Sequence, residues 1–203
     1  MVEDDRRGEE LIEATPVDVI SEILRNNPQI SELNFWAYRY VPLKFDESGR
    51  NPFWLIREQV LCDGALEEIE QSLGEGEQLA ISSRIKLVSN EVAHLPMMDF
   101  QTPKGKLGLQ LVRERFQHAG ISNGWILETG KSYHYYGNNV LNQEQWLGFM
   151  GLCLLTSVVH TRDNIEQVAD PRYIGHSLRR GCNTLRITTR GDKDFIPRIV
   201  ARI

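Results

Sequence analysis

The residues of this chain that could do chemistry fall in three short segments, and the first of them contains Asp99. The apolar run from Leu95 to Met98 precedes this carboxylate, and Phe100 and Gln101 follow it. An Asp at the end of a strand most often caps a turn or a helix, yet a carboxylate there can also hold a divalent cation. Asp99 is therefore a candidate metal ligand whose role depends on its neighbours.

The second segment, Thr129 to Tyr136, has the pattern of a tight hairpin turn followed by an aromatic strand. Gly130 at the apex would expose backbone N–H groups, and Lys131 and Ser132 add a cation and a hydroxyl. Such a turn could bind phosphate oxygens. His134 lies two residues past Ser132, so strand alternation lets both side chains project from one face. A histidine in an aromatic strand is otherwise usually structural, so both interpretations stand at this point.

The third segment begins with Val168, Ala169 and Asp170 and continues into a basic stretch. Asp170 follows small apolar residues much as Asp99 follows two methionines, so the two acids could end adjacent strands. A pair of carboxylates could then hold Mg²⁺ or Mn²⁺ together with substrate phosphates. Arg179 and Arg186 would supply forked donors to a nucleotide or to a nucleic-acid backbone.

Helices and strands that would position these segments alternate along the chain. Thr15 as cap and Pro16 at the first helical position predict a helix that stops before Pro28. The other expected elements are a strand over 33–43, a loop over 46–52, a helix over 52–73, strands over 79–89 and 92–100, a helix over 102–118, the hairpin over 125–136, a helix over 142–155 and a strand over 195–203. This order is typical of an α+β fold in which helices cover one side of a largely antiparallel sheet.

The chain has 203 residues, which fits a single domain over 15–203 after a flexible, charged start over 1–14. No secretion signal and no apolar run of membrane-spanning length is visible, which favours a cytoplasmic protein without a membrane partner. The three cysteines are far apart, so the sequence indicates neither a disulfide framework nor a zinc knuckle. We expect three buried or half-buried thiols, at Cys62, Cys153 and Cys182.

Charge is distributed unevenly along the chain. Residues 1–80 carry 7 basic and 18 acidic groups, whereas residues 171–203 carry 8 basic and 2 acidic groups. A concentrated basic segment on an acidic protein could meet phosphates at one place while the remaining surface repels a polyanion. A solvated basic face explains the same count equally well.

Taken together, the three segments resemble the archaeo-eukaryotic primase superfamily, which includes the primase-polymerases. The run from Met97 to Gln101 resembles its first motif, Thr129 to Tyr136 its histidine-bearing hairpin, and Ala169 to Asp170 with the stretch 178–188 its third motif. The resemblance covers about residues 79–190 and implies a palm or RRM-like core. It further implies a nucleotidyltransferase that uses nucleotide triphosphates, a nucleic-acid strand and divalent metal, with a helicase or other replication protein as a possible partner.

The same resemblance assigns roles to individual residues. Asp99 and Asp170 would be metal ligands, Ser132 and His134 would contact the triphosphate, and Arg186 would clamp a phosphate. The family's first motif normally carries a second acid where this chain has Gln101. An amide is a weaker cation ligand, so a degenerate palm that binds nucleotide or nucleic acid without turnover is the alternative. A third possibility is an unrelated α+β protein in which these residues are structural.

Overall fold

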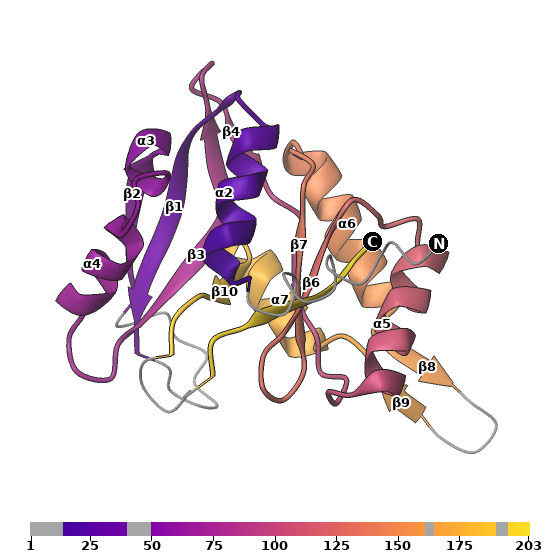
Figure 1. Cartoon of the computed structure of the whole chain (residues 1–203). Coiled ribbons are helices and arrows are strands. Elements are labelled where there is room, and N and C mark those ends of the chain that lie inside the picture. Colours follow the sequence, from indigo (N-terminus) through magenta and orange to yellow (C-terminus); the bar gives the residue numbers. More distant parts are fainter. Residues whose placement is uncertain (1–13, 40–49, 161–164, 190–194) are drawn as a thin grey trace, which may run out of the picture.

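The computed structural model describes residues 14–39, 50–160, 165–189 and 195–203. Two antiparallel sheets form the centre of the fold, and helices pack against both of them (Figure 1). The first sheet contains β1 (Ile30–Tyr38), β2 (Arg50–Ile56), β3 (Gln78–Leu87), β4 (Val92–His94) and β10 (Thr184–Arg186). The second contains β5 (Met97–Asp99), β6 (Gly124–Glu128), β7 (Tyr133–Gly137) and β11 (Arg198–Arg202).

Strand order places the segments of interest at the junction between the sheets. In the first sheet the order is β10-β3-β1-β2, with β4 also paired to β3, and in the second it is β11-β6-β7-β5. A separate two-stranded ribbon is formed by β8 (Val158–His160) and β9 (Ile165–Gln167). Since β5 and β10 contact each other across the two sheets, they form the boundary at which the candidate site lies.

Helices cover the sheets on several sides. Figure 1 shows α2 (Pro16–Asn26) between the two sheets, with α3 (Arg57–Val60) and α4 (Ala65–Ser72) beside the first sheet. The second sheet is accompanied by α5 (Lys106–His118), α6 (Gln143–Leu155) and α7 (Pro171–Arg180). At the start of α2, Asp18 accepts hydrogen bonds from the backbone and the hydroxyl of Thr15, and Asn142 caps α6 by accepting from Gln145 N.

The second sheet is buried on both faces, and its alternating side chains enter two different cores. Tyr133 and Tyr135 of β7 pack with α5 and α6, whereas Tyr136 enters the core shared by α2 and the first sheet. Trp146 and Met150 of α6 are fully buried, as their apolar surroundings in the sequence predict. The expected α+β fold is confirmed, but the strands form two main antiparallel sheets and the second is buried on both faces, whereas one sheet covered on one side was expected.

The prediction of one helix over 52–73 after a loop over 46–52 is wrong at its start. Residues from Arg50 to Ile56 form β2, and α3 and α4 follow as two short helices. Phe53 and Leu55 face the core while Trp54 and Ile56 are exposed, which is the two-residue alternation of a strand. Pro52 is compatible with it because β2 is an edge strand, where a missing N–H costs no ladder bond.

Two further boundaries differ from expectation. The strand expected over 92–100 is two strands, β4 and β5, in different sheets, because Leu95 and Pro96 turn the chain between them. The helix expected from residue 102 begins at Lys106, because Gly105 has a φ of 126° and its N–H and C=O are both bonded to the Tyr133 hydroxyl.

The helix α7 follows Asp170, where an acid at the end of a strand and then a basic stretch were expected. Asp170 caps it by accepting a hydrogen bond from Arg172 N at 2.8 Å, and Pro171 occupies the first helical position. The strand expected over 33–43 is observed as β1, with residues 40–43 outside the described ranges, as is nearly all of the start expected to be flexible. Cys153 and Cys182 are buried, but Cys62 is exposed, which corrects the expectation for that thiol.

Among the helices that the structure describes, none is long and apolar enough to span a bilayer.

Candidate functional site

Asp99 and His134 face each other across neighbouring strands. The register of β5 and β7 pairs these two residues directly, and His134 Nε2 lies 3.6 Å from an Asp99 carboxylate oxygen. The carboxylate is 39% exposed and the imidazole only 8%, so solvent can reach the acid while the histidine forms its buried support. This pair is the centre of the candidate site.

The buried position keeps His134 neutral at physiological pH. Burial lowers the pKa of His134 to about 3, and the positive charge of Arg186 acts in the same direction. The carboxylate of Asp99 favours the imidazolium, but removal from water outweighs that attraction. The contact between His134 and Asp99 is therefore a polar contact with a neutral imidazole.

Three side chains on one face of the hairpin have buried polar atoms that lack a hydrogen-bond partner among the described residues. They are Ser132 Oγ, His134 Nδ1 and Tyr136 OH, at alternate positions in and just before β7. Leaving such a group unpaired costs about 1–3 kcal/mol, and unexplained cases often mark a place where a ligand or water binds. The row follows the alternation that placed Ser132 and His134 on one face.

Asp170 lies beside this pair through an isolated antiparallel bridge. Phe100 pairs with Ala169, and Gln101 N donates to Val168 O at 2.9 Å, so the chain positions of Asp99 and Asp170 are next to each other across the bridge. One Asp170 carboxylate oxygen is engaged in capping α7. The structure thus places the backbone positions of the two acids side by side and gives the Asp170 carboxylate a structural role as the cap of α7.

Arg186 supplies the positive charge on the buried side of the site. Its guanidinium donates to the carbonyl of Thr188 and, at 3.0 Å, to that of Phe195. Phe195 in turn packs against the hairpin apex, where a Cβ on Gly130 would approach the Phe195 Cβ to 3.2 Å and where φ is 90°. Hairpin, Phe195 and Arg186 therefore hold one another in place.

The other two predicted cations lie farther out. Lys131 is exposed at the hairpin turn, where the Ser132 N–H is already bonded to the Thr129 hydroxyl. Arg179 is exposed in the last turn of α7, nine residues after Asp170, which corresponds to roughly 14 Å along a helix. The structure does not bring Arg179 beside the two acids.

Two tyrosines near the acids were missed by sequence reasoning. The pKa of Tyr173 is raised by burial and then by the charge of Asp99, while Arg180 opposes the shift. The pKa of Tyr136 is also raised by burial, with Arg186 opposing. Tyr136 could have been found by continuing the alternation from His134, but Tyr173 depends on α7, which the sequence did not predict.

The donor set fits one hard divalent cation better than two. Mg²⁺ commonly binds through one or two carboxylates and keeps several waters, and Asp99 with Asp170 would be such a pair. In the described ranges, no group of three or more His, Cys, Asp or Glu side chains is arranged to hold a metal ion. Gln101, exposed and two residues past Asp99, adds no charge.

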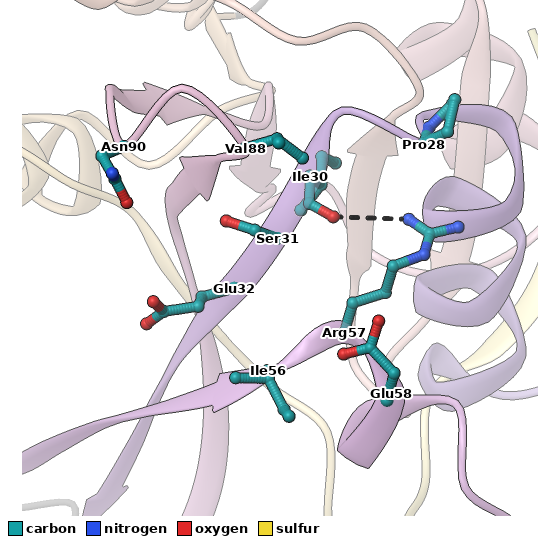
Figure 2. A pocket seen from close by; sticks show the side chains of 9 residues that line it. All are labelled: Pro28, Ile30, Ser31, Glu32, Ile56, Arg57, Glu58, Val88 and Asn90. Atoms are coloured by element: carbon teal, nitrogen blue, oxygen red, sulfur yellow. Dashed lines mark hydrogen bonds between the residues drawn. The ribbon is translucent and has the colours of Figure 1, made fainter.

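A separate open pocket of about 350 Å³ lies at the far end of the first sheet (Figure 2). Arg57 donates to the carbonyls of Asn27 and Ile30 there, and Glu32 and Glu58 add acidic side chains. The pocket adjoins the start of β1, whereas the candidate site lies near its end at Tyr38, a separation of roughly 25 Å along the strand. It is not part of the site.

Comparison with known proteins identifies one family. The family model of the archaeo-eukaryotic primase 1D-like proteins matches residues 58–195, which include Asp99, the hairpin and Asp170. No curated protein and no solved structure gives a significant match.

Proposed function

Because this chain belongs to the archaeo-eukaryotic primase 1D-like family, we propose that it is a nucleotidyltransferase that joins a nucleotide triphosphate to a nucleic-acid strand with the help of Mg²⁺ or Mn²⁺. The observation that carries the proposal is that Asp99 and His134 lie 3.6 Å apart, next to the chain position of Asp170. On the same face of the hairpin, three buried polar atoms, one of them in His134, have no hydrogen-bond partner within the described ranges. All of these residues lie within the matched region.

Each side chain has a role that its surroundings support. Asp99 and Asp170 would hold the cation, which when bound neutralises phosphate charge and stabilises the oxygens of an in-line displacement. The hydroxyl of Ser132 and the neutral imidazole of His134 would donate to phosphate oxygens, since each has a buried atom without a hydrogen-bond partner in the part of the chain that the structure describes. Lys131 at the turn and Arg186 below it would supply positive charge to the triphosphate.

The alternative is a palm that binds nucleotide without turnover, and Gln101 favours it. Without a second acid in this motif, the site lacks one negative charge that would hold two cations close together. One cation with two carboxylates can still position a triphosphate. The two candidates share the nucleotide site and differ in whether the phosphoryl transfer occurs.

Calorimetric titration with a nucleotide triphosphate and Mg²⁺ tests the shared part of the proposal. His134→Ala should weaken binding by about 10- to 150-fold, because a hydrogen bond to a charged group contributes about 1.5–3 kcal/mol. His118→Ala, on the exposed side of α5, is the matched control and should bind as the wild type does. Unchanged affinity in a folded His134→Ala variant would remove this residue from the site.

A further inference from the structure

We infer that single-stranded nucleic acid binds across the outer face of the first sheet, which presents aromatic and cationic side chains. We call this the aromatic face and define it by Trp36, Tyr38, Arg50, Trp54 and Lys86. The inference rests on the proposed function, because it names the surface on which the nucleic-acid substrate of that function would bind. Its structural basis is independent of the metal and nucleotide site.

Alternation along the strands creates the face. In β1, Leu33 and Phe35 enter the core, so Trp36 and Tyr38 project to the opposite side. The register with β2 places Trp54 opposite Asn34 and Arg50 opposite Tyr38 on the same side, and Lys86 of β3 pairs with Glu32. Trp36 and Trp54 thus lie on the side of the sheet that faces away from the hydrophobic core, where packing of the core does not require an aromatic side chain.

Cations and rings are interleaved on this face. The Arg50 guanidinium lies 5.9 Å from the ring centre of Trp36 and 5.6 Å from that of Tyr38, and Lys86 Nζ lies 4.6 Å from that of Trp54. Arg180 from α7 also lies over Trp36, at 5.9 Å. Proteins that bind single strands combine aromatic platforms for bases with cations that follow the phosphates, which is this combination.

Charge distribution favours a polyanion on this side of the sheet. The acidic helix α4, with Glu67, Glu68 and Glu70, carries Leu66 into the core on the other side of the sheet. On the aromatic face, Glu32 is paired with Lys86 at 2.8 Å. The excess of acidic over basic residues in positions 1–80 is therefore not located on the aromatic face.

The aromatic face is continuous with the candidate site. Arg186 of β10 pairs with Ala80 of β3, and Ala80 pairs with Trp36 of β1, so a row across three strands connects the arginine of the site with the tryptophan. Strands are about 4.8 Å apart, which places the two backbone positions within roughly 10 Å. Arg180, over Trp36, ends the helix that Asp170 begins. A single-stranded nucleic acid bound on the aromatic face would therefore extend to Asp99 and Asp170.

Fluorescence anisotropy with a labelled single strand of about 16 nucleotides tests the inference, in EDTA and without nucleotide triphosphate. DNA and RNA strands are titrated separately, with a duplex as competitor. Trp54→Ala should weaken binding about 5- to 150-fold, the range seen when one stacking aromatic is removed, whereas Trp54→Phe should bind nearly as the wild type does. Arg50→Ala should weaken binding and reduce its dependence on salt concentration.

Arg113→Ala is the control for charge, because Arg113 is exposed on α5, away from the aromatic face. Intrinsic fluorescence gives a second readout: Trp125 and Trp146 are buried, so quenching by the strand should come from Trp36 and Trp54 and should fall in Trp54→Phe. If Trp54→Ala does not fold, the inference is tested by fluorescence quenching in Trp54→Phe and by the binding affinity of Arg50→Ala. Wild-type binding in both Arg50→Ala and a folded Trp54→Ala would overturn the inference, as would a wild type that binds no single strand at low salt.

The two proposals can fail separately. A protein that binds nucleotide through His134 but holds no strand on the aromatic face would retain the proposed function and lose this inference. A protein whose strand binding depends on Trp54 and Arg50, but which binds no nucleotide, would do the reverse.

Discussion

At the scale of single residues, two tyrosines of β7 differ in whether their hydroxyl group forms hydrogen bonds within the protein. The Tyr133 hydroxyl donates to Gly105 O at 2.9 Å and accepts from Gly105 N at 2.8 Å, fixing the turn before α5. The Tyr136 hydroxyl, on the other face, is buried without a partner among the described residues. The first hydroxyl stabilises the native state and the second does not.

Replacing each of these tyrosines with phenylalanine should therefore give opposite results. Tyr133→Phe should lower the free energy of unfolding by about 0.5–1.5 kcal/mol, because the Gly105 N–H loses its acceptor, although Gly105 O keeps the hydrogen bond from Leu109 N. Tyr136→Phe should leave it unchanged or raise it, because an unpaired buried hydroxyl is removed. Urea denaturation measures both variants. Equal losses in the two variants would show that Tyr136 has a partner in the native protein.

His94 predicts a pH dependence of stability that lies outside the candidate site. Its ring stacks on Trp146, 4.7 Å between centres, and bonds Ser83 and Gln143. Burial lowers the pKa of His94 from 6.5, with Arg84 acting in the same direction and the Gln143 hydrogen bond opposing. The unfolded chain then binds the proton more readily, so the stability present above pH 6.5 is lost as the pH falls below it.

His94→Gln should be less stable overall but should lose part of the decline in unfolding free energy between about pH 7 and pH 5. His118→Gln, which removes an exposed histidine, should keep the wild-type decline. Urea denaturation at the two pH values gives the comparison. A wild-type decline in His94→Gln would mean that this ring does not contribute to it.

At the scale of elements, two glycines predict opposite responses to one added methyl group. A Cβ on Gly124 of β6 would meet Tyr135 Cε2 at 2.4 Å and Tyr136 O at 2.5 Å, whereas a Cβ on Gly148 of α6 meets nothing within 4 Å. Gly124→Ala should thus destabilise the hairpin by more than 1 kcal/mol, the order seen for overpacked sites. Gly148→Ala should raise the unfolding free energy by about 0.5–1 kcal/mol through helix propensity. Thermal unfolding of both variants checks the signs.

Sequence patterns within a few residues predicted some helices and strands correctly, but they failed where contacts with distant residues determine the structure. The hairpin and α6 follow from Gly130, from the aromatic alternation and from the Asn142 cap, all of which act within a few residues. The segment from Pro52 to Ile56 became a strand because β1 offered it an edge to pair with. Such an edge is set by distant residues, so the sequence of the segment alone could not indicate it.

The candidate site shows the same division. The alternation in β7 predicted that Ser132 and His134 share a face, and the likeness of the two acid-ending segments predicted that the chain positions of Asp99 and Asp170 are adjacent. The helix α7 was not predicted, and with it the capping role of Asp170, the remote position of Arg179 and the nearness of Tyr173 were missed.

For the whole molecule, the meeting of the two sheets would let one site face both the nucleotide and the nucleic-acid strand that we propose as its ligands. The second sheet contributes Asp99 and His134, and the first contributes Arg186 and, in our inference, the aromatic face. Contacts between β5 and β10 join the two contributions. The packing of these sheets thus positions the chemistry, and loss of that packing would separate the acids from the arginine.

A template-extension assay with Mg²⁺ and with Mn²⁺ tests the central claim most directly. We expect the wild type to add nucleotides to a primer, more readily with Mn²⁺ because it binds nitrogen and oxygen ligands more tightly. Gln101→Glu should raise this activity by restoring the family's second acid, and Asp99→Asn should abolish it. No extension by the wild type together with activity in Gln101→Glu would identify a palm that binds without turnover. Extension that persists in Asp99→Asn would contradict the account, because the carboxylate at its centre would then not be needed.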